Sequence, residues 1–180
     1  IGEDPFLVRG IRDKLWKLND YHGVQGLALF GIAGIDIALW DLWGQALGQP
    51  VSKLPGGCYR DRIKPYASIL FDQPEPLRDA LLVQKERGFK AIKMGWRPFG
   101  RVSRLLDELL IRTARETVGE DVELMVDAGG SEQFWPHSVS WARETAMMRG
   151  DYGITWFEEA LKPDDVEGFA QLQATSPVLI

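Results

Sequence analysis

The chain has 180 residues, of which 45 % are hydrophobic and 26 % are charged, and these are ordinary values for a globular domain. The formal net charge is -5, which argues against a nucleic-acid-binding surface because such surfaces are usually basic. The single cysteine, Cys58, cannot form an internal disulfide, so we expect a reducing, cytoplasmic setting. We find no run apolar enough to predict a bilayer-spanning helix and no signal peptide, so no membrane partner is expected.

Residues 1–57 are predicted to be one helical unit. A helix is expected from Leu27 to Leu47, because its apolar residues recur at intervals of three and four, which predicts a face turned towards a core. These residues are Ile32, Ile35, Leu39, Leu42 and Ala46. The pair Gly56-Gly57 marks a change of rhythm, so we predict a domain boundary there and a second domain over residues 58–180.

Beyond residue 57, strand-like and helix-like segments alternate. Strands are expected at 63–70, 89–96, 122–128 and 154–161, and a further strand begins at 177–180. Helices are expected at 74–87, 103–118, 138–149 and 164–174. This alternation predicts an α/β fold with parallel strands and right-handed crossovers. A doubly wound sheet and a (β/α)₈ barrel both fit, although no G-x-G-x-x-G motif follows a strand, which weakens the dinucleotide-binding fold.

The chain looks too short for a complete barrel, which needs eight strands and about 250 residues. An isolated half-barrel would have open edge strands, and these promote aggregation. The chain also starts without Met and stops inside an apolar, β-branched run. We therefore expect a piece of a longer protein, truncated at both ends, with the rest of the barrel in the missing part or in another chain.

Charged residues lie where three of the predicted strands end. Lys93, Asp127 and Glu158 are each on the strand face opposite their apolar neighbours, because side chains alternate along a strand. They are spaced one strand-helix unit apart, so we expect them to meet at one height on one rim. The C-terminal rim holds the active site of barrel enzymes. A lone strand-end carboxylate can instead cap a helix or form a surface ion pair, but three charges in consecutive units favour a site.

The chemistry of these residues predicts a metal site. Two converging carboxylates repel each other unless a cation lies between them, and oxygen ligands favour a hard ion such as Mg²⁺. We therefore predict that Asp127 and Glu158 bind Mg²⁺, which would act as a Lewis acid on a substrate carboxylate. Lys93 is the predicted catalytic residue, which would remove or position a proton. Trp96 and Trp135, in loops after strands, are candidates for substrate contact, although packing explains either position equally well.

At these residues the chain resembles the enolase superfamily, specifically the mandelate racemase/muconate lactonizing group. The segment GIDIALWDLWG at 34–44 resembles the last helix of the family's N-terminal capping domain. The segments GFKAIK at 88–93, MVDA at 125–128 and WFEE at 156–159 resemble the second, third and fourth barrel strands. The resemblance implies the first half of a (β/α)₈ TIM-type barrel, preceded by the helical end of an α+β capping domain.

The resemblance also implies roles for individual residues. Asp127 and Glu158 match the first two Mg²⁺ ligands, and the third would lie just past Ile180, at the end of the fifth strand. The family commonly has Lys-x-Lys on the second strand. Lys93 matches the first Lys, but Gly95 stands where the second Lys, the base, would be. Lys93 is thus expected to bind the substrate carboxylate as an alternative to taking a proton, and the family's His–Asp base pair belongs to later strands.

A single base favours elimination, because a racemase generally needs a base on each face of the substrate carbon. We therefore expect a Mg²⁺-dependent carbon–oxygen lyase. It would abstract the proton α to a carboxylate, through a metal-stabilised enolate, and dehydrate an acid sugar. The alternatives are a racemase, epimerase or cycloisomerase of the same superfamily, or a non-catalytic pseudoenzyme or assembly scaffold. The expected partners are a small-molecule carboxylate and further copies of the chain in a homo-oligomer.

Overall fold

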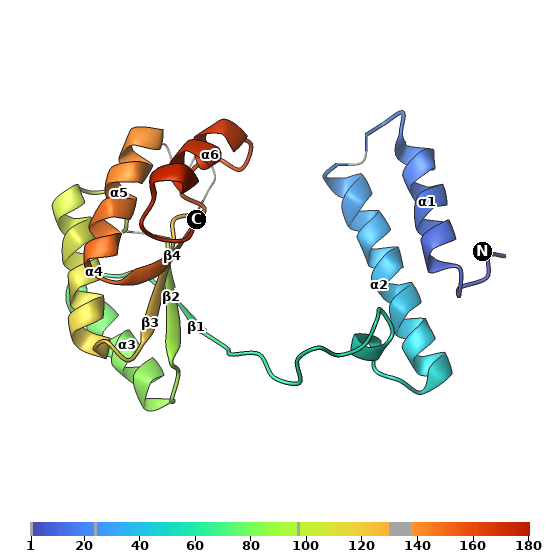
Figure 1. The fold of residues 1–180 in the computed structure, drawn as a ribbon, viewed down its shortest axis with the longest axis horizontal. Coiled ribbons are helices and arrows are strands. Elements are labelled where there is room, and N and C mark those ends of the chain that lie inside the picture. The colour runs from blue at the N-terminus through green and yellow to red at the C-terminus, as the bar shows by residue number, and fades with distance from the viewer. Residues whose placement is uncertain (1, 24, 97, 130–137) are drawn as a thin grey trace. The chain divides into compact units, whose positions relative to one another are not determined.

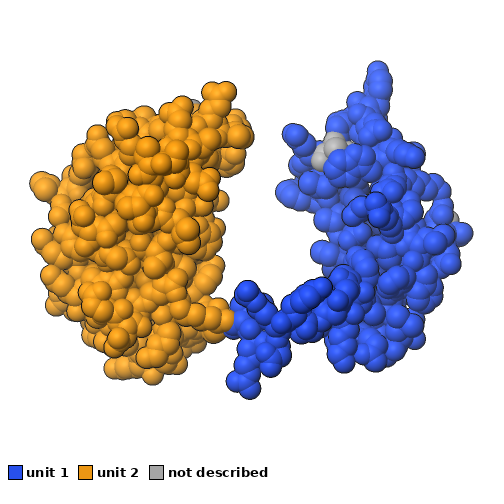
Figure 2. Space-filling model, viewed as in Figure 1, with its two compact units in different colours: residues 1–63 blue, residues 64–180 orange. Residues whose placement is uncertain are grey.

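The computed structural model describes residues 2–23, 25–96, 98–129 and 138–180. The chain divides into two compact units, residues 1–63 and 64–180 (Figure 2). The sequence suggested a domain boundary after residue 57, and that boundary stays a prediction. Trp135 lies outside the described residues, so its predicted substrate contact also stays a prediction.

The described residues of the first unit form two α-helices and a short 3₁₀ helix. Its helix α1 (Val8–Asn19) packs against α2 (Leu27–Leu47), and η1 (Val51–Lys53) follows. The bounds of α2 confirm the predicted helix. It ends because Gly48 adopts a left-handed backbone with φ of 61° and donates its N–H to the carbonyl of Gln45, a usual way for a helix to stop.

The buried face of α2 agrees only in part with the predicted one. Ile32 is buried, but Ile35 and Leu42 are each 44 % exposed. Instead, Phe6 packs on Trp43, with ring centroids 5.6 Å apart. One neighbouring helix covers only one side of α2, so its other apolar residues stay exposed within this unit. The spacing therefore predicted the helix correctly and its buried face in part, because Ile32 is buried and Leu39 is half-buried.

Helix α2 also corrects a prediction about membranes. By length and composition alone it could cross a bilayer, whereas the sequence analysis found no segment that could. Asp36 and Asp41 lie within it, and an interior helix of a globular protein passes the same test. The expectation of no membrane partner therefore stays a prediction.

The second unit is built on a four-stranded parallel sheet. Its strands are β1 (Ala67–Leu70), β2 (Ala91–Gly95), β3 (Glu123–Asp127) and β4 (Ile154–Glu158). Its helices are α3 (Pro74–Glu86), α4 (Arg104–Val118), α5 (Val139–Asp151) and α6 (Val166–Thr175). Each strand and helix predicted for this part of the chain is confirmed. The strands are shorter than expected, and several of the helix ends shift by one or two residues.

The strand order selects the barrel over the doubly wound sheet. The order is β1–β2–β3–β4, and α3, α4 and α5 lie on one side of the sheet (Figure 1). A doubly wound sheet would reverse its order at a switch point and carry helices on both faces, whereas sequential parallel strands with outer helices form a barrel wall. Leu179 continues the series, because its N–H donates to the Thr155 carbonyl at 3.1 Å and its carbonyl accepts from Phe157 at 2.8 Å. The predicted start of a fifth strand is thus confirmed.

The core of this unit lies between the sheet and its helices. The strand residues in it are buried, as are their helical partners. They include Ile92, Met94, Leu124, Val126 and Phe157 of the strands and Leu77, Leu81, Leu110 and Ile111 of the helices. Burying one such side chain contributes about 1.5–3 kcal/mol. Since side chains alternate along a strand, this burial turns the residues between them towards the opposite face of the sheet.

Two charged side chains, Asp107 of α4 and Arg149 of α5, are buried in this unit. Arg149 of α5 is fully buried, and its guanidinium carbon is 3.4 Å from the ring centroid of Phe157 and 4.6 Å from that of Phe99. No described residue accepts a hydrogen bond from the Arg149 side chain, and burial lowers its pKa. Cation–π attraction to the two rings and the negative charge of the Asp107 carboxylate therefore stabilise it. Because Phe99 belongs to the loop after β2, this contact ties that loop to β4.

Candidate metal centre

The three charged residues predicted from the strand ends come together. Lys93 Nζ lies 2.5 Å from Glu158 Oε2 and 3.2 Å from Asp127 Oδ2. The side chains of Lys93, Asp127 and Glu158 are 11 %, 16 % and 28 % exposed. One ammonium group thus bridges two carboxylates in a place that water reaches only partly. Their roles as ligands and catalyst stay predictions.

Lys93 starts from a lower layer of the sheet than expected. The strand register pairs Asp127 with Glu158 and with Gly95, whereas Lys93 pairs with Met125. The prediction of one common height is therefore correct for the two carboxylates and wrong for Lys93. The lysine still reaches them because its flexible four-carbon stem spans the two-residue difference.

Two aromatic rings flank the ammonium group. Lys93 Nζ is 5.4 Å from the ring centroid of Tyr66 and 5.5 Å from that of Trp156, within cation–π range. Burial by itself lowers the pKa of Lys93. The hydrogen bonds to Glu158 and Asp127 raise this pKa by more than burial lowers it, so the net pKa lies above its ordinary value. Lys93 is therefore a cation in this arrangement.

Sequence reasoning missed both rings. Trp156 lies two residues before Glu158, so strand alternation places it on the same face and was a usable signal. Tyr66 precedes β1, and nothing in its neighbourhood in the sequence pointed to the site.

Left-handed turns follow three of the strands, and those after β2 and β3 fix the orientation of Asp127. Trp96, Gly129 and Glu159 each follow a strand with a left-handed backbone, at φ of 68°, 69° and 52°. In residues with a Cβ such strain costs about 1–3 kcal/mol and is typical of functional sites. Gly129 donates its N–H to Asp127 Oδ1 at 3.0 Å, and Trp96 donates its N–H to the Asp127 carbonyl at 3.1 Å. Asp127 Oδ2 is thereby turned towards Lys93.

Trp96, the predicted substrate contact, lies at the same rim. Its side chain is 55 % exposed. Two indole atoms, Cδ1 and Nε1, lie 3.5 and 3.6 Å from the point where a Cβ on Gly129 would stand. The indole therefore lies beside the turn after β3. Its contact with a substrate stays a prediction.

The carboxylates fit a hard divalent cation, but they do not complete its shell. Asp127 Oδ2 and Glu158 Oε2 converge on one point, and Mg²⁺ is usually held by one or two carboxylates with water and substrate in the other positions. Within the described ranges, no group of three His, Cys, Asp or Glu side chains could hold a metal ion. A third protein ligand would have to come from elsewhere, as the resemblance implied for the position past Ile180.

Comparison with known families accounts for most of the chain. Residues 77–180 match the family described as enolase C-terminal domain-like. Residues 1–56 match the mandelate racemase / muconate lactonizing enzyme N-terminal domain. The two matches thus include α1 and α2 of the first unit and the part of the second unit that carries Lys93, Asp127 and Glu158.

Individual relatives agree with these matches. The chain is 34 % identical over 185 residues to D-galactarolactone cycloisomerase of Agrobacterium fabrum (strain C58), covering 99 % of this chain and 46 % of that protein. The solved 3,6-anhydro-D-galactonate cycloisomerase from Zobellia galactanivorans superposes with a TM-score of 0.88 at 29 % identity, covering 99 % and 48 % of the two chains. A mandelate racemase/muconate lactonizing protein from Paracoccus denitrificans PD1222, solved in complex with magnesium, superposes with a TM-score of 0.85 at 28 % identity. The match covers 96 % of this chain and 47 % of that one.

The chain therefore spans less than half the length of each of these relatives. Two of the relatives are named cycloisomerases, and the third holds magnesium in its solved structure. The similarity extends over nearly all of the present chain in each case.

Proposed function

Because the chain belongs to the mandelate racemase/muconate lactonizing group of the enolase superfamily, we propose that it forms part of a Mg²⁺-dependent enzyme that removes the proton α to the carboxylate of a sugar acid. The observation that carries this proposal is the convergence of Asp127 and Glu158 on one cation position. Two partly buried carboxylates around one point favour a cation there. Bound Mg²⁺ would offset the negative charge that the substrate carboxylate gathers as the proton leaves.

Lys93 is assigned to the substrate carboxylate rather than to the proton. Its ammonium group is charged, and such a cation stabilises the charge that develops on the substrate during proton removal. Gly95, two residues along the same strand, presents no side chain. The nearest atom that a Cβ there would meet is the Cβ of Asp127, at 3.5 Å. This leaves room for substrate beside Asp127, and no described residue is assigned as the base.

The relatives favour a cyclic sugar acid as the substrate. Removal of the α proton allows the oxygen on the β carbon to leave. A free hydroxyl leaves as water, which is dehydration, whereas a ring oxygen stays attached elsewhere and the product is an isomer. A lactone and an anhydro sugar acid, the substrates in the names of two relatives, are both cyclic. We therefore favour ring-opening isomerisation over the dehydration that the sequence suggested. Both reactions begin with removal of the α proton.

The test supplies the full-length protein with Mg²⁺ and with aldonic acids, aldaric acids and their lactones in D₂O. We expect a 2-keto-3-deoxy acid carrying one solvent deuterium at the carbon that lost its oxygen, read by NMR. The reaction should stop when EDTA removes the metal. Failure of every cyclic and open-chain acid to react, with metal bound, would contradict the proposal.

Racemisation or epimerisation is the second candidate, supported by the magnesium-bound relative named for mandelate racemase. It predicts exchange of the α proton for deuterium with inversion and without a keto product. A protein that binds no metal and exchanges no proton would instead be a non-catalytic scaffold. The same NMR experiment separates these outcomes.

A further inference from the structure

The two carboxylates of the candidate metal centre share one counter-ion. Lys93 Nζ is 2.5 Å from Glu158 Oε2 and 3.2 Å from Asp127 Oδ2. Among the described residues, no other Lys, Arg or His side chain is within ion-pair distance of either carboxylate. The ammonium group therefore stands where the carboxylate oxygens converge, which is where a metal ion would bind.

We propose that Lys93 is a built-in counter-ion of Asp127 and Glu158, and that a divalent metal ion must displace it. Metal binding would then release Lys93 to bind the substrate carboxylate. This inference rests on the proposed function for the identity of the metal and the substrate. It adds an order of events, in which the metal binds first and the lysine becomes available second.

The ammonium group and a metal ion cannot occupy this point together. Mg²⁺ binds oxygen at about 2.0–2.1 Å, so an ion held by Asp127 Oδ2 and Glu158 Oε2 would lie close to the position of Lys93 Nζ. Like charges at such a separation repel strongly in a partly buried place. Binding is therefore an exchange of one cation for another.

The surroundings of Lys93 allow it to leave without a change in the backbone. The rings of Tyr66 and Trp156 already lie 5.4 and 5.5 Å from Nζ and would continue to attract the ammonium group after it leaves the carboxylates. Gly95 carries no side chain that would block the stem as it moves along β2. The lysine also begins one layer below the carboxylates, so it can withdraw towards its own layer.

The exchange has a measurable consequence for metal affinity. A ligand binds more weakly in proportion to the fraction of molecules that are competent to bind it. If Lys93 holds the carboxylates about nine-tenths of the time, the apparent Kd for metal is about tenfold weaker than the intrinsic one. Lys93→Met keeps the length and apolar stem but removes the charge, so it should bind metal more tightly.

The first experiment titrates the full-length protein with Mg²⁺ alone by calorimetry. We expect Lys93→Met to bind at least about tenfold more tightly than the parent. The matched control is Lys64→Met, which removes a lysine that pairs with Glu123 at 2.5 Å at the other end of the sheet and should leave the Kd unchanged. Equal or weaker binding by a folded Lys93→Met protein would overturn the inference.

A second experiment reads the lysine itself. The parent protein is treated briefly with an amine-acylating reagent, with and without saturating Mg²⁺, and labelling of each lysine is measured by peptide mass spectrometry. Labelling of Lys93 should rise about tenfold with metal, while Lys64 should label equally in both states. Metal binding with unchanged labelling of Lys93 would contradict this inference alone. Absence of metal binding by the parent would contradict both the inference and the proposed function.

Discussion

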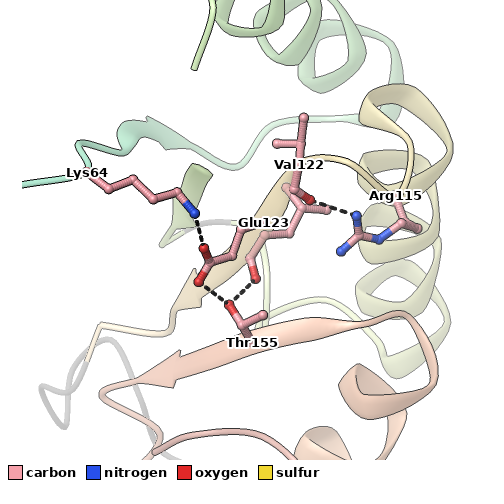
Figure 3. Close-up of polar contacts among 6 residues, drawn as sticks. Lys64, Arg115, Val122, Glu123 and Thr155 are labelled. Carbon is pink, nitrogen blue, oxygen red and sulfur yellow. Dashed lines mark hydrogen bonds and ion pairs between the residues drawn. The ribbon is translucent and has the colours of Figure 1, made fainter. Parts of the chain in front are cut away.

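The two ends of the parallel sheet carry similar side chains in different arrangements. At the N-terminal end, Lys64 pairs with Glu123 at 2.5 Å, and Thr155 also donates a hydrogen bond to Glu123 at 3.2 Å (Figure 3). At the C-terminal end, Lys93 alone serves two carboxylates. The Glu123 carboxylate has two donors of its own, so its charge is balanced by its neighbours. Asp127 and Glu158 share one cation, so together they can bind a further positive charge. The first arrangement holds structure together, and the second can bind a ligand.

The backbone shows the same difference. Arg115 of α4 donates to four carbonyl groups around the N-terminal ends of β3 and β4, at 2.7–2.9 Å; Figure 3 shows the bond to Val122. At the other end the strands run into left-handed turns, and Trp96 is half-exposed. In barrel enzymes the residues at the N-terminal face of the strands stabilise the fold, and those at the C-terminal face form the active site.

The largest effect should come from removing a metal-binding carboxylate. We expect Asp127→Asn to lower kcat/KM at least about a thousandfold, or about 4 kcal/mol of transition-state stabilisation. Glu123→Gln, an equivalent change at the other end of β3, should leave kcat/KM within about twofold, under about 0.5 kcal/mol. Steady-state kinetics and metal titration of both variants measure this. Similar losses of kcat/KM in the two variants would contradict the functional difference between the two ends of the sheet.

The next effect concerns stability at the N-terminal end. Arg115→Ala leaves four carbonyl groups without a charged donor, so the free energy of unfolding should fall by about 3 kcal/mol. The Kd for metal should stay that of the parent under conditions where the variant is folded. Urea denaturation and calorimetry give the two values. A loss under about 1 kcal/mol would mean that water replaces the guanidinium without penalty.

Two glycines provide a matched test of smaller size. Gly129 at the C-terminal end and Gly153 at the N-terminal end have φ of 69° and 65°, and a Cβ on each would lie 3.5 Å from Trp96 and Arg115 respectively. An alanine in this backbone region costs about 1–2 kcal/mol, so Gly129→Ala and Gly153→Ala should destabilise the protein similarly.

Only Gly129→Ala should affect the substrate. A methyl group there would contact the Trp96 indole in a strained turn, and if that ring touches the substrate, KM should rise roughly fivefold, or about 1 kcal/mol. Gly153→Ala should leave KM unchanged. Equal KM values in the two variants would remove Trp96 from the list of substrate contacts.

Much of the second unit could be predicted because its signals are local. The alternation of strand and helix patterns follows from periodicity, and the charges Asp127 and Glu158 lie at strand ends that the sequence marks by a change from apolar to polar residues. Neighbouring parallel strands of equal length then place these ends together. The strand order and the meeting of the two carboxylates follow from that rule.

The features that escaped prediction depend on register and on distant packing. Lys93 lies one layer lower than expected because the offset between β2 and β3 is set by the pairing of whole strands. The face that α2 buries depends on which helix lies against it. Arg149 lies in the core between two rings, where periodicity alone would place an apolar residue. None of these three is a property of one segment.

The smallest effect is the pH dependence of the Lys64–Glu123 pair. The hydrogen bond from Lys64 lowers the pKa of Glu123 below its ordinary 4.5. A depressed carboxyl pKa adds stability above the ordinary value, and this stability is lost as the pH falls through the folded-state pKa. The parent should therefore be more stable than Glu123→Gln at about pH 7 and equal to it at about pH 3.

The difference at neutral pH should stay below about 1 kcal/mol, because the Lys64 and Glu123 side chains are 57 % and 39 % exposed and water and salt screen such pairs. Thermal melts of both proteins across this pH range measure it, and 1 M salt should shrink it, because salt at about that concentration screens charges beyond about 3 Å. The control is Glu120→Gln, which removes an exposed carboxylate with no ion pair among the described residues and should show no such trend. A gap between parent and Glu123→Gln that persists in acid would mean that the Thr155 hydrogen bond, rather than the ion pair, is what Glu123 contributes to this end of the sheet.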